Sequence, residues 1–167
     1  MRNLSAGMVE RLALDALAGA GCDAALAQSG AKAAAFLESV GYPGLSLISE
    51  ALADNAQIGR SERLVPEYGL LDTKGISCLF LAPELDRLVK EQGRIVLMQV
   101  KHGLFLVPWS IWGNYAIGCP VDPSFALGGP RERNPYAEKI AKSAETGIEV
   151  DEAVISRLAA LSQDGKS

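Results

Sequence analysis

The longest apolar run in the chain spans residues 94–112, and it limits what the chain can fold into. Side chains of a strand alternate between its two faces, and at the start of this run the residues of both faces are apolar. This pattern predicts a central strand over 95–101. A second strand is predicted over 104–111, joined to the first by a two-residue turn at His102-Gly103. This second strand contains a proline, which has no N–H to donate, so we expect it at a sheet edge or a bulge. The run therefore predicts a β-hairpin with one buried and one exposed strand.

Three helices are predicted before any strand. Ser5 is a suitable N-cap for a helix that ends near Ala20, and Asp23 is a suitable N-cap for a second helix that ends near Val40. A third helix is predicted over 45–53. The second helix has a contact stripe of Ala and Gly, which lets helices approach closely, so the first two helices are expected to form an antiparallel hairpin.

The middle of the chain predicts a βαβ unit. Residues 56–75 are expected to form a connection with one short strand near Leu70, and we predict a boundary between subdomains there. A strand follows over 76–81. Pro83 suits the first turn of a helix that ends at Gln92, because the N–H of that position has no partner within the helix. The strand over 95–101 completes the unit.

The C-terminal part predicts a long irregular stretch, then two helices. A loop over 118–135 is long for a compact domain and indicates function or disorder. A helix is expected over 136–145, and Asp151 caps the last helix. The whole chain is thus predicted to be one α+β domain, with N-terminal helices packed on a small mixed β-sheet and flanking C-terminal helices. Its parts are a helical part over 1–57, a sheet-containing part over 70–117 and C-terminal helices over 136–163.

Composition excludes few classes of function. The chain has 167 residues, a net charge of −4 and a pI near 5.1, so no basic surface is expected and we predict binding neither to nucleic acid nor to an anionic membrane. No apolar run reaches the roughly 20 residues that span a bilayer. The three cysteines are widely spaced, and charged residues interrupt the first helix where a secretory signal would be apolar. We expect a cytoplasmic bacterial protein with free thiols.

His102 is the only histidine, and it is the first candidate for acid–base chemistry, because the ordinary pKa of histidine lies near neutrality. The simpler interpretation is a turn residue before Gly103. One histidine and scattered cysteines do not supply the four closely spaced ligands of a structural zinc site, so neither a metal nor a cofactor is predicted. No residue is assigned a catalytic role.

The loop over 118–135 holds a second set of candidates. Cys119 and Asp122 open it, and Arg131 and Arg133 close it. A thiolate beside an arginine is a potential nucleophile, and two arginines can hold a small anionic ligand by forked hydrogen bonds. The alternative is a small buried cysteine with solvated arginines.

Trp109 and Trp112 lie near the predicted sheet edge. Tryptophan usually packs in a core, but two at an edge can form a contact between subunits or the wall of a ligand site. We therefore predict a homo-oligomer that uses this surface, with the two tryptophans also among the candidate binding residues.

Two resemblances extend these inferences. The segments 10–21, 41–45 and 147–151 resemble a bacterial family of unknown function, and the likeness covers most of the chain loosely and implies no activity. The N-terminal helices are also similar in outline to those of type-2 malate/L-lactate dehydrogenases. The position that matches the catalytic histidine of that family is Pro43, so the resemblance implies a decayed or accessory relative.

The leading hypothesis for function is a non-enzymatic cytoplasmic binding or protein-interaction domain. The alternative is a small-molecule enzyme, or a decayed dehydrogenase-like accessory protein, that acts on a small carboxylate. In that alternative His102 or Cys119 is the reactive group, and Arg131 or Arg133 binds the substrate.

Overall fold

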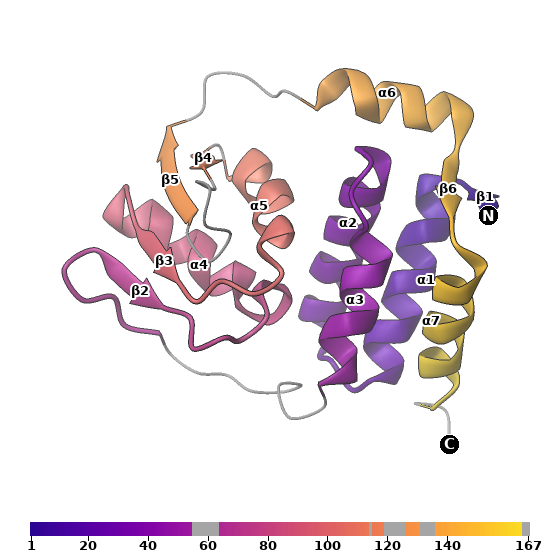
Figure 1. Ribbon diagram of the computed structural model, residues 1–167, viewed down its shortest axis with the longest axis horizontal. Coiled ribbons are helices and arrows are strands. Elements are labelled where there is room, and N and C mark those ends of the chain that lie inside the picture. Colours follow the sequence, from indigo (N-terminus) through magenta and orange to yellow (C-terminus); the bar gives the residue numbers. More distant parts are fainter. Residues whose placement is uncertain (55–63, 114, 119–125, 131–135, 165–167) are drawn as a thin grey trace. The chain divides into compact units, whose positions relative to one another are not determined.

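The computed structural model describes residues 1–54, 64–113, 115–118, 126–130 and 136–164 (Figure 1). The chain divides into two compact units. Unit 1 comprises Met1–Gly59 and Pro135–Ser167, and unit 2 comprises Arg60–Asn134. The predicted helical part and the C-terminal helices therefore fall in unit 1, and the sheet-containing part falls in unit 2.

Unit 1 is mainly helical. Its elements are β1 (Arg2–Leu4), α1 (Ala6–Gly19), α2 (Ala24–Ser39), α3 (Gly44–Ala53), α6 (Ala137–Thr146), β6 (Ile148–Val150) and α7 (Glu152–Asp164). Helix α1 packs against α2 and α7, and α3 packs against the same two helices, so these four run side by side (Figure 1).

The N-caps predicted in unit 1 are confirmed. The Ser5 hydroxyl accepts a hydrogen bond from the Met8 amide at 3.2 Å, and the Asp23 carboxylate accepts one from the Leu26 amide at 2.8 Å. The Asp151 carboxylate accepts one from the Ala153 amide at 2.8 Å at the start of α7. Each side chain satisfies an amide that has no acceptor within its own helix.

The small residues of α2 explain how closely the helices pack. The buried face of α2 consists of Ala27, Gly30, Ala31, Ala33, Ala34, Ala35 and Leu37. At Gly44, which begins α3, a Cβ atom would lie 2.5 Å from the backbone oxygen of Ala34. The backbones of α2 and α3 therefore meet at a place where only glycine fits.

A two-stranded sheet, which the sequence analysis missed, joins the two ends of unit 1. Strand β1 pairs antiparallel with β6, in a register that places Leu4 opposite Ile148, and both side chains are buried. The Asn3 side-chain amide donates to the Thr146 carbonyl oxygen at 3.1 Å and to a Glu149 carboxylate oxygen at 2.9 Å. These contacts hold the end of α6 against the N-terminal strand.

Unit 2 contains a mixed sheet. Its elements are β2 (Leu70–Asp72), α4 (Cys78–Gln92), β3 (Val96–Met98), the 3-10 helix η2 (Gly103–Phe105), α5 (Leu106–Trp112), β4 (Tyr115–Gly118) and β5 (Ala126–Pro130). The strand order is β2-β3-β5-β4, with β2 parallel to β3 and the other pairs antiparallel. Strand β3 is internal, as predicted, but it spans Val96–Met98 rather than 95–101, and β2 confirms the short strand near Leu70. The stretch 118–135 was predicted to be irregular, but it contains strand β5. The βαβ unit is β2–α4–β3.

The predicted strand over 76–81 is wrong, because α4 begins at Cys78 and only Ser77 makes an isolated bridge, to Lys101. The helix therefore begins before Pro83. Its first turns are buried on several sides, since Leu79 and Ala82 are fully buried and Leu81 nearly so. An apolar run buried all round looks the same in a strand and in a helix, so periodicity does not separate them.

The predicted strand over 104–111 is also wrong, so there is no β-hairpin at residues 94–112. The chain there forms η2 and α5. Pro108 lies in the first turn of α5, where a missing N–H costs no hydrogen bond. Leu106, Pro108, Trp109 and Ser110 are buried, so this helix is buried on several sides, and its apolar pattern resembles that of a buried strand.

The α+β class is confirmed, with a helical unit and a unit that contains a small mixed sheet. In the described part of the chain, no helix combines the length and the apolar character needed to cross a membrane.

Candidate functional site

The two tryptophans lie in different environments. Trp109 is 8% exposed and belongs to the core of unit 2, whereas Trp112, at the end of α5, is 49% exposed. Their rings meet edge to face with centroids 5.9 Å apart. They do not lie on an edge strand, so the predicted edge-strand surface does not form. The role predicted for them in self-association stays a prediction.

The other predicted binding residues, Cys119, Asp122, Arg131 and Arg133, lie outside the described residues. The hypothesis that they bind a small anion therefore stays a prediction.

His102 is not in a hairpin turn. Its backbone is left-handed, with φ of 56°, and it precedes η2. Its Nδ1 atom lies 2.7 Å from the Ser77 hydroxyl oxygen, a contact that the spacing of 25 residues in sequence did not indicate. Ser77 is fully buried at the N-cap of α4, where its hydroxyl also accepts from the Leu79 amide at 3.3 Å. The hydrogen bond thus joins the start of α4 to the segment after β3.

These residues belong to the carboxyl edge of the parallel strands β2 and β3, where α/β proteins often bind ligands. Here the polar groups of the edge form hydrogen bonds within the protein. The buried Thr73 hydroxyl donates to the carbonyl oxygens of Met98 and Gln99, at 2.9 and 2.8 Å. The Asp72 carboxylate accepts from the Lys74 amide at 2.8 Å. The edge is therefore held together by internal hydrogen bonds.

An open groove in unit 1 combines apolar surface with a smaller share of polar surface. It has a volume of about 630 Å³, within the range of small-molecule sites. One wall is the end of α2 with the turn to α3, and the other is α6 with β6. The lining residues are Glu38, Ser39, Val40, Gly41, Tyr42, Pro43, Lys139, Lys142, Ser143, Thr146, Gly147, Ile148 and Glu149.

The first wall forms because α2 ends in a Schellman motif. Gly41 has φ of +88°, a left-handed conformation that favours glycine, and its amide donates to the Glu38 carbonyl oxygen at 3.2 Å. The Tyr42 amide donates to the Leu37 carbonyl oxygen at 2.9 Å. The reversal places Tyr42 and Pro43 at the groove, before α3 begins.

Glu38 supplies the cap that α3 lacks. Pro43 is the N-cap residue and makes no side-chain cap, but a Glu38 carboxylate oxygen accepts from the Leu45 amide at 2.8 Å. Burial raises the pKa of the Glu38 carboxyl group, and the hydrogen bond from Leu45 opposes that rise. Burial of the charged carboxylate of Glu38 in the groove therefore costs free energy.

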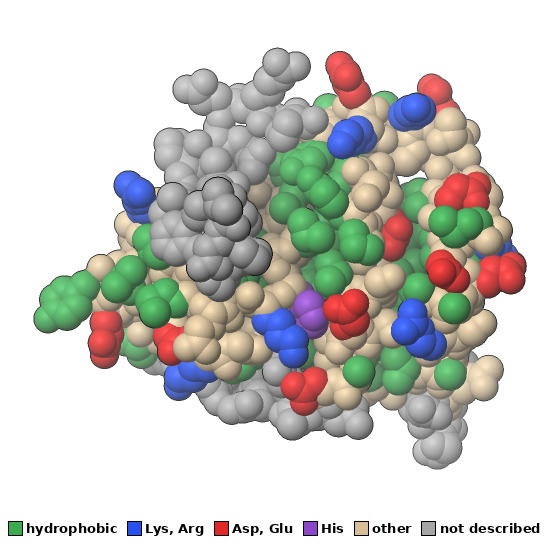
Figure 2. All heavy atoms as spheres, viewed as in Figure 1, with side chains coloured by type: hydrophobic (Ala, Val, Ile, Leu, Met, Phe, Trp, Pro, Cys, Tyr) green, Lys and Arg blue, Asp and Glu red, His purple; other side chains and the backbone are tan. Residues whose placement is uncertain are grey.

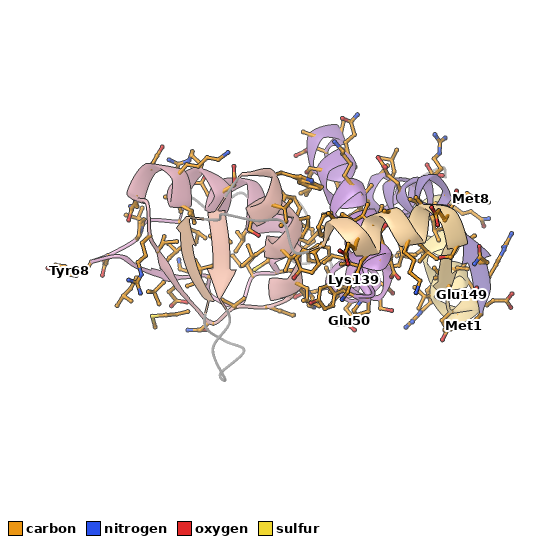
Figure 3. The ribbon with its side chains drawn as sticks, turned by 90° about the horizontal axis from the view of Figure 1, so that it is seen from above. Met1, Met8, Glu50, Tyr68, Lys139 and Glu149 are labelled. Carbon is orange, nitrogen blue, oxygen red and sulfur yellow. The ribbon has the colours of Figure 1, made fainter. Side chains whose placement is uncertain are left out.

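The second wall is one face of α6. Lys139, Lys142, Ser143 and Thr146 follow the spacing of residues that share a helix face. Figure 2 shows basic and acidic side chains together along α6, and Figure 3 labels Lys139 on this helix and Glu149 on β6. None of the α6 residues is buried, so this wall is a surface helix that packs on α2 by one side.

An aromatic cluster joins the two walls near the start of α6. The Tyr136 ring meets the Phe36 ring and the Tyr42 ring edge to face, with centroids 5.9 and 6.3 Å apart. Such contacts contribute about 0.5–1.5 kcal/mol each beyond the burial of their area. They fix α6 against the turn after α2 and so set the width of the groove.

Two carboxylates and two lysines line the groove. Glu38 accepts from the Leu45 amide, and Glu149 accepts from the Asn3 amide. Within the described residues, the structure gives the ammonium groups of Lys139 and Lys142 no ion pair. Each carboxylate already accepts a hydrogen bond within the protein, so the two lysines are the charged groups of the groove that can bind an anion.

The described residues offer little for metal or thiol chemistry. Over those residues, no group of three or more His, Cys, Asp or Glu is placed to hold a metal ion. Burial, with a smaller effect of Asp23, raises the pKa of the Cys22 thiol to about 11, so this thiol stays protonated at neutral pH.

Comparison with known proteins finds no matching family model, no matching curated protein and no matching solved structure. The two resemblances expected from the sequence therefore stay predictions.

Sequence reasoning missed Lys139, Lys142 and Tyr42 as candidate binding residues. Two lysines at helical spacing usually indicate a solvated face, and the pattern contains nothing that distinguishes a groove wall. The pairing of β6 with β1, the packing of α6 on α2 and the aromatic contacts of Tyr136 bring the two walls together.

Proposed function

We propose that the chain is a non-enzymatic binding protein and that its unit 1 groove takes a small dicarboxylate. The proposal rests on one observation, the two lysines that share the α6 face of the groove and form no ion pair with any residue that the structure describes. Each ammonium group offers three N–H donors and a full charge to a carboxylate. Two lysines one turn apart suit a ligand with two carboxylates.

The rest of the groove fits the same class of ligand. The exposed Pro43 ring gives it apolar surface for a short hydrocarbon chain, to which the nearly buried Val40 and Ile148 add little. The Tyr42 phenol and the Ser143 hydroxyl add neutral hydrogen-bonding groups. A lysine–carboxylate contact at an open groove is screened by salt, so binding is expected to weaken as ionic strength rises.

A thermal-shift titration with succinate, benzoate and inorganic phosphate tests the proposal, because a ligand that binds only the folded state raises the melting temperature by mass action. Succinate is expected to give a saturable rise. In Lys139→Ala and Lys142→Ala variants the dissociation constant should rise about tenfold each, the loss of one charged hydrogen bond. Arg157→Ala is the control, since Arg157 is exposed on α7 outside the groove and its loss changes the net charge equally.

An equal succinate affinity in the lysine variants and the control would place binding elsewhere. A rise with phosphate alone would replace the dicarboxylate by a phosphate ligand, and no rise with any probe would remove the proposal.

A second candidate function is a small-molecule enzyme, favoured by the hydrogen bond between Ser77 and His102. A histidine in contact with a serine hydroxyl can act as the base that activates it. The full burial of Ser77 opposes this role. Labelling with a fluorophosphonate probe that is lost in Ser77→Ala would support the enzyme, and no labelling at Ser77 would leave the binding function as the better account.

A further inference from the structure

The β2 edge of unit 2 exposes a group of large apolar side chains. Val65 is 71% exposed, Tyr68 is fully exposed, and Leu70 and Met98 are 47% and 42% exposed. We call these four residues the edge patch. Exposed large apolar groups that lie together, rather than singly, mark contact surfaces.

Tyr68 is the least expected member of the edge patch. It lies with Gly69 in a two-residue turn, where the Glu67 and Leu70 amides donate to each other's carbonyl oxygens at 2.9 Å. Both turn residues have positive φ, 53° for Tyr68 and 75° for Gly69, a pattern that favours Asn or Gly at the first position. A bulky residue in this conformation costs of order 1 kcal/mol. Figure 3 shows Tyr68 extending away from the sheet, and its full exposure means that burial against the described residues of unit 2 does not offset that cost.

A hollow of about 570 Å³ lies beside the Tyr68 ring, lined by the edge patch together with Leu64, Glu67, Asp72 and Lys74. The same surface thus offers a projecting ring and a hollow that can receive one. It also bears both signs of charge, Glu67 and Asp72 against Lys74. Two copies of such a surface can meet across a twofold axis, so that the acidic side chains of one copy face Lys74 of the other.

We infer that the edge patch is a contact between two copies of this chain, with Tyr68 of each copy inserted into the hollow of the other. The contact is made by side chains and does not extend the sheet at Leu70, because the N–H and C=O groups of Leu70 are already bonded to Glu67 in the turn. The dimer places Tyr68, not the tryptophans of α5, at its centre.

Sedimentation velocity of the full chain, from micromolar to submillimolar concentration, tests the dimer. Wild-type protein should show a monomer–dimer equilibrium. Tyr68→Gly should raise the dissociation constant about tenfold or more, as expected for a central aromatic anchor. Glycine suits the left-handed backbone at this position, so this variant should fold normally, which far-UV circular dichroism checks. Trp112→Ala, which removes an exposed aromatic residue outside the edge patch, should leave the equilibrium unchanged.

Exchanging the charges of Lys74 and Glu67 tests whether the partner is a second copy of this chain. Lys74→Glu and Glu67→Lys should each weaken the dimer, and the double variant should restore it, because opposite charges then face each other again. A wild-type protein that stays monomeric at every concentration overturns the inference, and so does a dimer that Tyr68→Gly leaves intact. Failure of this test does not affect the unit 1 groove, which shares no residue with the edge patch.

Discussion

Glu38 connects the stability of unit 1 to pH. Its carboxylate accepts from the Leu45 amide at 2.8 Å, and Leu45 is fully buried. In Glu38→Ala that amide loses its acceptor. Loss of a helix cap costs about 1 kcal/mol, and a buried unsatisfied amide costs about 1–3 kcal/mol. Since the alanine also removes a buried carboxylate, we expect a net loss of about 1–2 kcal/mol at neutral pH.

The Glu38→Gln variant separates the effect of the helix cap on stability from the effect of the carboxylate charge. Glutamine keeps an oxygen that can accept from Leu45, but it has no carboxylate to desolvate. Burial raises the pKa of Glu38 in the folded state, so the folded state binds this proton more tightly than the unfolded state does. The resulting contribution to the free energy of unfolding is complete below the unfolded-state pKa and is lost as pH rises through the folded-state pKa. The glutamine variant should therefore be more stable than wild type at pH 7, and the difference should vanish on acidification below the ordinary carboxyl range.

Urea unfolding followed by far-UV circular dichroism, at neutral and acidic pH, measures both variants. A Glu38→Ala protein as stable as wild type would show that the carboxylate does not cap α3. A Glu38→Gln protein less stable than wild type at pH 7 would contradict the raised pKa.

Further predictions concern the packing of each unit. Gly44→Ala should destabilise unit 1 by about 1–3 kcal/mol, because the added Cβ would lie 2.5 Å from a backbone oxygen. Gly7→Ala should be neutral or stabilising, because its Cβ would meet only one atom, at 4.0 Å. Urea unfolding compares the stabilities of the two variants. Ser77→Ala should cost about 1–2 kcal/mol by removing a helix cap and the bond to the imidazole, and an unchanged urea midpoint would disprove that role. Trp109→Ala should cost about 3–5 kcal/mol as a buried aromatic, and the exposed Trp112→Ala much less; equal losses would contradict their different burial.

The helices of unit 1 could be predicted because local patterns specify them. Ser5 and Asp23 cap their helices as expected, and the Ala and Gly stripe of α2 is buried where the spacing places it. Caps and amphipathic spacing act over a few residues, so a sequence shows them directly. The strands β1 and β6 could not be found in this way, since each is three residues long and is stabilised by a partner far along the chain.

Unit 2 was harder to predict because its apolar runs are buried on several sides. The segments that contain Leu79 and Leu106 read equally well as strands and as helices, and the structure forms helices at both. The groove was missed for a different reason. Its residues come from α2, α6 and β6, and only tertiary packing brings Tyr42 near Lys142.

Titration of ¹⁵N-labelled protein with succinate, followed by two-dimensional NMR, tests most directly whether the unit 1 groove binds a dicarboxylate. Binding in the groove should give saturable shifts of the backbone amides of Gly41, Tyr42, Lys142 and Ser143, with residues of unit 2 unchanged. Saturable shifts confined to the carboxyl edge of β2 and β3, around Thr73 and Lys101, would contradict it, as would a spectrum that succinate leaves unaltered.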